Sequence, residues 1–274
     1  MSDPRPIGVF DSGVGGLTVA RAIFGLLPHE RVLYLGDNGR FPYGPRPLEE
    51  IRRFGLEIAG HLVERDVKML VVACNSVEVA AIADVADAHG VPVVGVVEPG
   101  ARAAVHATRN GRIGMIGTIA TVDSGAYGRA IEATGANVEL FSAPCPVFVE
   151  HVEAGDTSSD GLLEAARGYL EPLVREGVDT LILGCTHYPM LSGLIQYVMG
   201  EDVVLVSSAE ETAKDVYAVL REDAMLREDG EPVHEFLTTG DPEQFRAIAH
   251  HFLGPDIGGV GSVAVAGAQG VAWS

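Results

Sequence analysis

The chain is short of features that would each mark a class of protein. It has 3 cysteines in 274 residues, no C-x-x-C pair, and 19 lysines and arginines against 38 aspartates and glutamates. So few cysteines, so widely spaced, exclude a disulfide framework and do not suggest a zinc or thiol-redox site. The net charge of −19 argues against a broad surface for nucleic acid or anionic membrane.

Long apolar runs are also absent. No stretch approaches the roughly 18 residues of a membrane span, and the opening MSDPRPIGVFDSG lacks the charged start and apolar core of a secretory signal. We therefore expect a cytoplasmic protein that neither enters a membrane nor binds nucleic acid directly. The content of 47% hydrophobic residues is enough for packed cores, and the length suggests two domains at roughly 150 residues each.

What the sequence does contain is one pattern that occurs twice. MLVVACNSVEV (69–79) and TLILGCTHYPM (180–190) are each an apolar run of strand length that ends in a cysteine followed by polar residues. Buried parallel strands have such runs, and open α/β sheets bind ligands at the carboxyl ends of their strands. The pattern therefore predicts Cys74 and Cys185 at two ligand-binding sheet edges.

The spacing along the chain indicates an internal duplication. The two cysteines are 185 − 74 = 111 residues apart, and the strands that open the two halves, at Ile7 and Ile113, are 113 − 7 = 106 residues apart. Offsets this similar predict two related α/β units that place a thiol on the same strand end.

The glycine-rich loop after the first strand, residues 11–16, does not favour a nucleotide site. Thr18 stands where G-x-G-x-x-G needs its third glycine, and no Walker lysine follows. H-E-x-x-H is absent as well, and His250-His251 is interpreted as part of a polar helix face. We therefore expect no nucleotide and no metal.

Several connecting elements are also predicted. Residues 91–97 read as a strand that ends at Glu98-Pro99-Gly100, and residues 235–240 read as the last strand of the chain. Pro172 is expected to bend its helix or to lie near the last turns. The Gly- and Ala-rich ending has little periodicity, so its final dozen residues are expected to be mobile.

Two thiols in equivalent places suit one particular chemistry. Inversion at a carbon that bears a proton needs a base on one face and an acid on the other. A thiol near its ordinary pKa is mostly protonated at neutral pH, so neighbouring groups must control its charge. Asp11 near one cysteine and His187 beside the other are the right types, and Glu153 is a further candidate with Glu150 as its competitor. Cys145, between two prolines, is interpreted as a structural residue.

Five ordered motifs carry a resemblance to a known family. They are GVFDSGVGGLTV (8–19), LGDNGRFPYGPRP (35–47), VVACNSVEV (71–79), VFVEHVEAG (147–155) and LGCTHYPML (183–191). With them the chain resembles the glutamate racemases of the cofactor-independent aspartate/glutamate racemase superfamily over nearly its whole length.

The resemblance implies an α/β fold of two pseudo-symmetric, doubly wound parallel-sheet domains with the active site in the cleft between them. The first domain would comprise 1–97 and 207–274, and the second 98–206. It also implies interconversion of L- and D-glutamate for peptidoglycan synthesis, cell-wall biogenesis and cell shape, without pyridoxal phosphate or any other cofactor. A homodimer is expected, and DNA gyrase is a further partner that some relatives bind.

The resemblance also implies roles for individual residues. Cys74 and Cys185 would be the two acid/bases, with Asp11, Glu153 and His187 as auxiliary residues. Substrate contacts would come from small polar and loop residues, namely Asp11, Ser12, Pro42, Tyr43, Gly44, Asn75, Ser76, Thr118, Thr121, Thr186 and His187. One departure is Ser76-Val77, where relatives usually have Thr-Ala; the serine keeps the hydroxyl, whereas the lost methyl group and the larger valine change the local packing.

Two alternatives stay open at this stage. One is racemisation of aspartate or another amino acid by the same scheme, and the other is a non-catalytic, partner-binding role like that of gyrase inhibitors. Turnover of D-glutamate and of D-aspartate, measured separately, and proton exchange at Cα would separate the three.

Overall fold

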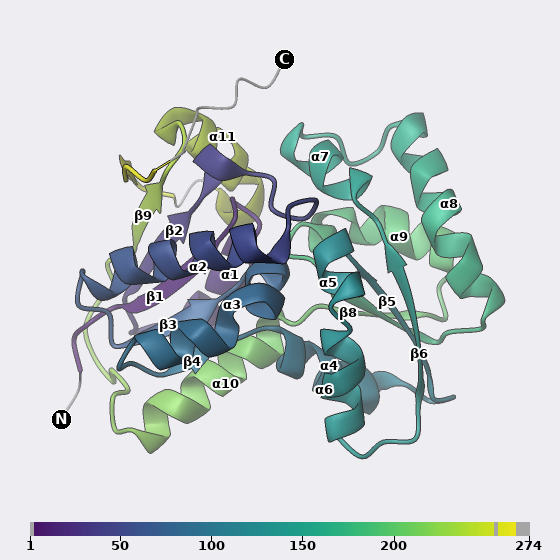
Figure 1. Cartoon of the computed structure of the whole chain (residues 1–274), viewed down its shortest axis with the longest axis horizontal. Coiled ribbons are helices and arrows are strands. Elements are labelled where there is room, and N and C mark those ends of the chain that lie inside the picture. The colour runs from purple at the N-terminus through teal and green to yellow at the C-terminus, as the bar shows by residue number, and fades with distance from the viewer. Residues whose placement is uncertain (1–2, 255–256, 267–274) are drawn as a thin grey trace. The chain divides into compact units, whose positions relative to one another are not determined.

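The structure is a computed structural model that describes residues 3–254 and 257–266 (Figure 1). It contains two compact units. Unit 1 takes its described residues from Met1–Val96 and Ala209–Ser274, and unit 2 is Val97–Ser208. The boundaries expected from the sequence lie at 97/98 and 206/207.

Unit 1 is built on a six-stranded parallel sheet with the order β10-β9-β2-β1-β3-β4. The strands are β1 (Ile7–Asp11), β2 (Val32–Gly36), β3 (Met69–Val72), β4 (Val93–Val94), β9 (Glu235–Thr238) and β10 (Val260–Ser262). Every residue of β1, β2 and β3 is buried. These strands are apolar along their length because helices cover both faces of the sheet.

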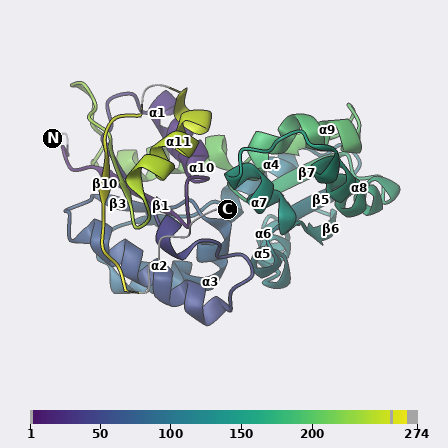
Figure 2. The same cartoon turned by 90° about the horizontal axis from the view of Figure 1, so that it is seen from above.

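The helices of unit 1 form two layers. On one side lie α2 (Leu48–Val63) and α3 (Asn75–Ala88), and on the other α1 (Leu17–Leu26), α10 (Ala209–Glu222) and α11 (Pro242–Leu253), as Figure 2 shows. Each buries an apolar stripe, such as Ile51, Phe54 and Ile58 on α2. A 3-10 turn, η1 (Asn38–Arg40), precedes α2.

Unit 2 has a four-stranded parallel sheet with the order β6-β5-β7-β8. The strands are β5 (Arg112–Gly117), β6 (Glu139–Pro144), β7 (Thr180–Gly184) and β8 (Val204–Val206). The helices are α4 (Val97–Ala107), α5 (Ile119–Asp123), α6 (Ala126–Ala133), α7 (Val147–Glu153), α8 (Asp160–Arg175) and α9 (Ser192–Met199), with the 3-10 turn η2 (Tyr188–Leu191). Helix α4 packs on α6, and α8 packs on α9.

The two sheets repeat one design. In unit 1 the first four strands lie in the order second, first, third, fourth, and the four strands of unit 2 lie in the same order. The first strand of each unit also contains a glycine against which neighbouring side chains pack closely. A Cβ at Gly8 of β1 would lie 3.1 Å from both Leu70 and Val67, and a Cβ at Gly114 of β5 would lie 2.9 Å from Leu181. The predicted pair of related parallel α/β units is confirmed.

The helix that follows the fourth strand of each unit belongs to the other unit, so α4 and α10 are exchanged between the units. Helix α4 follows β4 of unit 1 in the chain but packs on β7 and β8 of unit 2. Helix α10 follows β8 of unit 2 but packs on α1 and β4 of unit 1. Each unit is therefore completed by a helix that comes, in the chain, directly after the fourth strand of the other unit.

Some predicted elements differ from the structure. The strand predicted over 91–97 is only β4, and Glu98, Pro99 and Gly100 belong to α4 instead of ending a strand. Proline is tolerated in the first turn of a helix because its missing N–H would have no intrahelical partner there. Strand β9 is not the last strand, because β10 pairs with it. Of the final dozen residues, 267–274 lie outside the described part of the chain.

The prediction for Pro172 is confirmed: it lies inside α8, close to the end of that helix at Arg175. No helix among the described residues has the length and apolar character needed to cross a membrane.

Candidate active site

In unit 1, Ser12 and Cys74 meet because two neighbouring strands end side by side. Strands β1 and β3 pair up to Phe10 and Val72, and the Ala73 N–H donates to the Phe10 carbonyl at 3.0 Å. The chain then leaves β1 at Asp11-Ser12 and leaves β3 at Cys74. The Cys74 thiol donates to Ser12 Oγ across a distance of 3.6 Å.

The surroundings of Cys74 favour a neutral thiol. Its residue is 6% exposed, and burial, followed by the nearby Asp11 carboxylate, raises the pKa of the thiol far above its ordinary value. The N–H groups of Val77 and Ser12, together with the Ser12 hydroxyl, oppose this shift of the pKa without cancelling it. Cys74 is therefore arranged as a proton donor when no ligand is present.

The remaining expected residues of this half border the same strand ends. Asp11 is buried, and its Oδ2 accepts the Gly13 N–H at 3.0 Å. Asn75 and Ser76 are buried in the first turn of α3, directly after Cys74. Ser76, the position that departs from the family pattern, therefore lies two residues after Cys74 in the chain.

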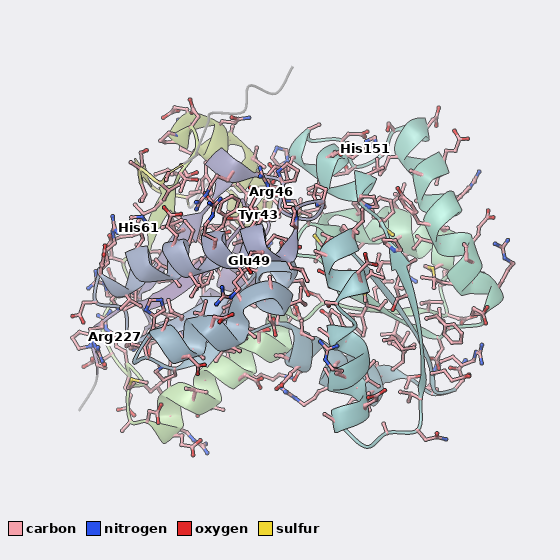
Figure 3. The ribbon with its side chains drawn as sticks, viewed as in Figure 1. Tyr43, Arg46, Glu49, His61, His151 and Arg227 are labelled. Carbon is pink, nitrogen blue, oxygen red and sulfur yellow. The ribbon has the colours of Figure 1, made fainter. Side chains whose placement is uncertain are left out.

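We call residues 41–44, Phe41-Pro42-Tyr43-Gly44, the proline turn; it lies between η1 and α2. Tyr43 is buried, and its hydroxyl donates to the Asp37 carboxylate, so the phenol points inward. Tyr43 and Arg46 are labelled on this loop in Figure 3.

In unit 2, Thr118 and Cys185 follow two paired strands in the same way. Gly117 of β5 is the partner of Gly184 of β7, so the two residues that follow begin at adjacent positions. Thr118 Oγ1 accepts the Thr121 N–H at 3.2 Å and lies 3.0 Å from the Thr121 hydroxyl oxygen. Both threonines are buried.

Cys185 has an imidazole neighbour. Its Sγ lies 3.8 Å from His187 Nδ1, and His187 Nε2 lies 2.6 Å from Glu153 Oε1. Thr186 Oγ1 lies 3.5 Å from the same Nδ1. Both His187 and Glu153 are buried, so the line from thiol to carboxylate is largely shielded from water.

The charge of His187 follows from these contacts. Burial alone would lower its pKa, but the hydrogen bonds to Cys185 and Glu153 outweigh that effect and raise the pKa well above the ordinary value. A charged ring donates from both nitrogens, one toward Cys185 and one to Glu153. The positive ring therefore faces the Cys185 sulfur on one side and the Glu153 carboxylate on the other.

The structure also decides between competing residues. Glu150, on the same helix α7 as Glu153, is exposed, whereas Glu153 faces His187. Cys145 is buried; its Sγ lies 3.7 Å from the Ala143 carbonyl oxygen, and its own carbonyl accepts the Tyr188 hydroxyl at 2.8 Å. Those contacts fit the structural interpretation of Cys145.

Sequence reasoning missed Asp37 and Arg40. Asp37 is fully buried directly after β2, and Arg40 Nε donates to its Oδ2 at 2.7 Å. A charged residue at the carboxyl end of a buried parallel strand was the available signal, because that edge is where ligands bind. Among residues 3–254 and 257–266, no group of three His, Cys, Asp or Glu side chains is arranged to hold a metal ion.

Comparisons with known proteins show the family and the fold. Residues 17–216 match the Asp/Glu/hydantoin racemase family. A glutamate racemase of Mycobacterium leprae is 56% identical over 263 residues, which cover 95% of this chain and 96% of that protein. The crystal structure of glutamate racemase isoform RacE1 from Bacillus anthracis matches with a TM-score of 0.89 and 42% identity over 95% of this chain and 97% of that one. A Francisella tularensis glutamate racemase in complex with D-glutamate matches with a TM-score of 0.89 and 33% identity over 97% and 98% of the two chains.

Proposed function

The chain belongs to the glutamate racemases of the Asp/Glu/hydantoin racemase family, and we propose that Cys74 and Cys185 interconvert L- and D-glutamate by a two-base reaction. Membership makes the protein an isomerase and implies that its D-glutamate serves peptidoglycan synthesis. The observation that carries the residue assignment is the repeated strand end, which places one thiol in each unit beside groups that control its proton.

The reaction moves one proton off Cα and another onto its opposite face. A cysteine thiolate takes the Cα proton, the electron pair of the C–H bond stays on carbon, and the other cysteine's S–H donates its proton from the far side. The first sulfur then carries a proton and the second is a thiolate, so the reverse reaction uses the same groups in exchanged roles. The scheme requires both sulfurs to reach the same Cα.

The two thiols have different neighbours for this exchange. Burial and Asp11 raise the pKa of Cys74, which suits an acid. The His187 ring, held by Glu153, lies beside Cys185, so that its positive charge would face the sulfur when Cys185 acts as the base.

Substrate binding would rest on hydroxyl, amide and main-chain groups. The proposed contacts in unit 1 are Asp11, Ser12, Pro42, Tyr43, Gly44, Asn75 and Ser76, and those in unit 2 are Thr118, Thr121, Thr186 and His187. Buried N–H and hydroxyl donors can hold carboxylates without a basic surface, which fits a chain of net charge −19. We also propose a homodimer in the cytoplasm, for which gel filtration of the purified protein is the first check.

The test is Cα proton exchange with both amino acids. In deuterium oxide, the protein should racemise D- and L-glutamate, seen as a decay of circular dichroism, and should place deuterium at Cα of the product. Turnover of aspartate alone would move the assignment to an aspartate racemase. Absence of deuterium at Cα of either enantiomer of both amino acids would leave a binding protein instead of an enzyme.

A further inference from the structure

One arginine takes up the carbonyl oxygens around the proline turn. The Arg46 N–H donates to the Tyr43 carbonyl at 2.8 Å. The Arg46 guanidinium donates from Nε to the Pro42 carbonyl and from Nη2 to the Arg40 carbonyl, each at 2.9 Å. Its third nitrogen, Nη1, donates to Glu50 Oε1 on α2 at 3.0 Å. The carbonyl groups of this loop are therefore turned toward Arg46.

This arrangement leaves the turn with N–H groups to offer. Proline has no N–H, so the donors are those of Tyr43 and Gly44, and neither donates to another residue in the described part of the chain. The carbonyls of Pro42 and Tyr43 are occupied by Arg46, whereas the N–H groups of Tyr43 and Gly44 are available, and this combination suits an anion. By binding carbonyl oxygens of the proline turn, Arg46 leaves the turn with N–H donors that can face a ligand.

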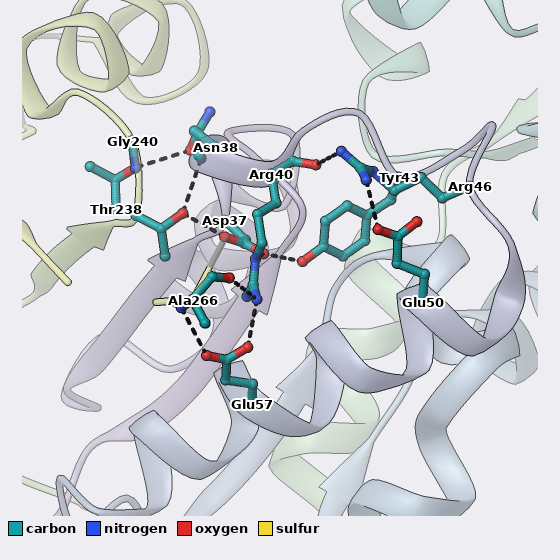
Figure 4. Close-up of polar contacts among 12 residues, drawn as sticks. Asp37, Asn38, Arg40, Tyr43, Arg46, Glu50, Glu57, Thr238, Gly240 and Ala266 are labelled. Atoms are coloured by element: carbon teal, nitrogen blue, oxygen red, sulfur yellow. Dashed lines mark hydrogen bonds and ion pairs between the residues drawn. The ribbon is translucent and has the colours of Figure 1, made fainter. Parts of the chain in front are cut away.

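A second arginine holds the turn from inside unit 1. Arg40 donates from Nε to Asp37 Oδ2 at 2.7 Å and from Nη1 to Glu57 Oε2 at 2.5 Å. The same Asp37 carboxylate accepts the Tyr43 hydroxyl (Figure 4). Since the Arg40 side chain is 2% exposed and that of Asp37 fully buried, this ion pair is shielded from water and fixes the phenol in one place.

Phe54 of α2 connects the two arginines. The Arg40 guanidinium carbon lies 4.1 Å from the centre of the Phe54 ring, and that of Arg46 lies 5.4 Å from it. The Tyr43 ring packs against the same phenylalanine with a centroid distance of 5.3 Å. Planar guanidinium groups stack on aromatic rings in a way that an ammonium group does not.

We propose that Arg40 and Arg46 form an arginine clamp, which holds the proline turn with its N–H groups available to a carboxylate of the substrate. Both are positioning residues: they act through the turn and need not touch the substrate. The inference rests on the proposed function, because it takes the proline turn as part of the glutamate site. It adds two residues whose guanidinium geometry, and not only their charge, is required.

The first experiment separates binding from turnover. Arg46→Gln should raise KM for D-glutamate about tenfold, since the two charge-assisted hydrogen bonds to the Pro42 and Arg40 carbonyls are lost, while kcat stays within about threefold. Arg46→Lys should recover little of that loss, because an ammonium cannot bridge two carbonyls as the guanidinium does. The matched control is Arg52→Gln, which breaks the Arg52–Asp84 ion pair between α2 and α3 and leaves the turn intact; its KM should stay within about twofold of wild type.

The second experiment reads the turn directly. Hydrogen exchange of the peptide that contains residues 41–47 should become about tenfold faster in Arg46→Gln, and stay unchanged in Arg52→Gln, when followed by mass spectrometry. Arg40→Lys should accelerate exchange in the same peptide. If Arg40→Lys does not fold, the two Arg46 variants decide the matter, because Arg46 lies nearer the surface, with 30% of its side chain exposed.

The outcomes are distinguishable. A rise in KM with faster exchange supports the clamp. An unchanged KM in folded Arg46→Gln, a full recovery in Arg46→Lys, or a lower melting temperature without faster exchange overturns it. If the wild-type protein fails to racemise glutamate, the proposed function fails by itself, and unchanged exchange in Arg46→Gln would still overturn the clamp.

Discussion

The two thiols occupy equivalent strand ends but have different neighbours. Cys74 faces a hydroxyl, Ser12, at 3.6 Å, whereas Cys185 faces the His187 ring at 3.8 Å. The two neighbours come from different strand ends. Ser12 follows β1, the first strand of unit 1, whereas His187 follows Cys185 itself after β7 and is held by Glu153 of α7. The two units repeat the position of the sulfur but not the group beside it.

The largest effect is expected when the two sulfurs are removed one at a time. Cys74→Ala and Cys185→Ala should each lower racemisation by a factor of about 1,000 or more, because each removes an acid/base group. Circular dichroism with D- and with L-glutamate measures the loss. Cys145→Ala is the matched control and should keep most of the activity. Full activity in either of the first two variants would refute the two-base scheme.

The next largest effect separates the two thiols by pH. Because the pKa of Cys74 is raised, the thiol stays protonated as pH rises through the ordinary range, and only the thiolate reacts with iodoacetamide. Its alkylation rate should therefore rise about tenfold per pH unit, or about 100-fold from pH 7 to 9, without a plateau. Site-resolved mass spectrometry on the ligand-free protein measures the rate. A plateau below pH 8 would contradict a raised pKa at Cys74.

A smaller effect is expected from the ring beside Cys185. His187→Gln keeps a polar side chain but removes the charge, so kcat/KM should fall about 30-fold, the range of a hydrogen bond to a charged group. The alkylation rate of Cys74 should not change, whereas that of Cys185 should fall. His250→Gln, on the exposed part of α11, serves as control. Equal changes at both cysteines would contradict separate control of the two thiols.

The smallest effect should come from the hydroxyl beside Cys74. Ser12→Ala removes one weak thiol–hydroxyl contact, and the N–H groups of Ser12 and Val77 that also face the sulfur remain. We expect kcat/KM to fall about threefold, the lower range of a neutral hydrogen bond. Initial rates in both directions give the measurement. A loss as large as that of His187→Gln would show that the two thiols depend on their neighbours to the same degree.

The two strands that precede the cysteines could be predicted from the sequence for a physical reason. Buried parallel strands are near-continuous apolar runs, as MLVV and TLILG are, and the cysteine just after each is therefore predicted at the ligand-binding edge of its sheet. The choice of Glu153 over Glu150 could not be made in this way, since both lie on one short helix and only packing decides which one is buried. Glu98-Pro99-Gly100 misled for a related reason: the same residues that end a strand also start a helix.

The residues of the arginine clamp were invisible to sequence reasoning. The three prolines of segment 37–47 restrict its backbone by themselves. In the structure, contacts with α2 and with Thr239, which lies some 200 positions later in the chain, also hold it: Arg46 bonds to Glu50, and Thr239 Oγ1 donates to Asp37. Hydrogen bonds between residues so far apart leave no periodic trace in the sequence.

The exchange of α4 and α10 has a consequence for the order in which the chain can fold as it leaves the ribosome. Unit 2 is one continuous segment, so all its parts exist once residue 208 has been made. Unit 1 then still lacks α10, which covers α1, and β9, which pairs with β2. Domains that emerge first usually fold first. In this protein, unit 1 begins the chain, yet the edge of β2 and one face of α1 stay uncovered until residues 209–238 have been made. Cys74 therefore comes first in the sequence, but the unit that holds it is completed after the unit that holds Cys185.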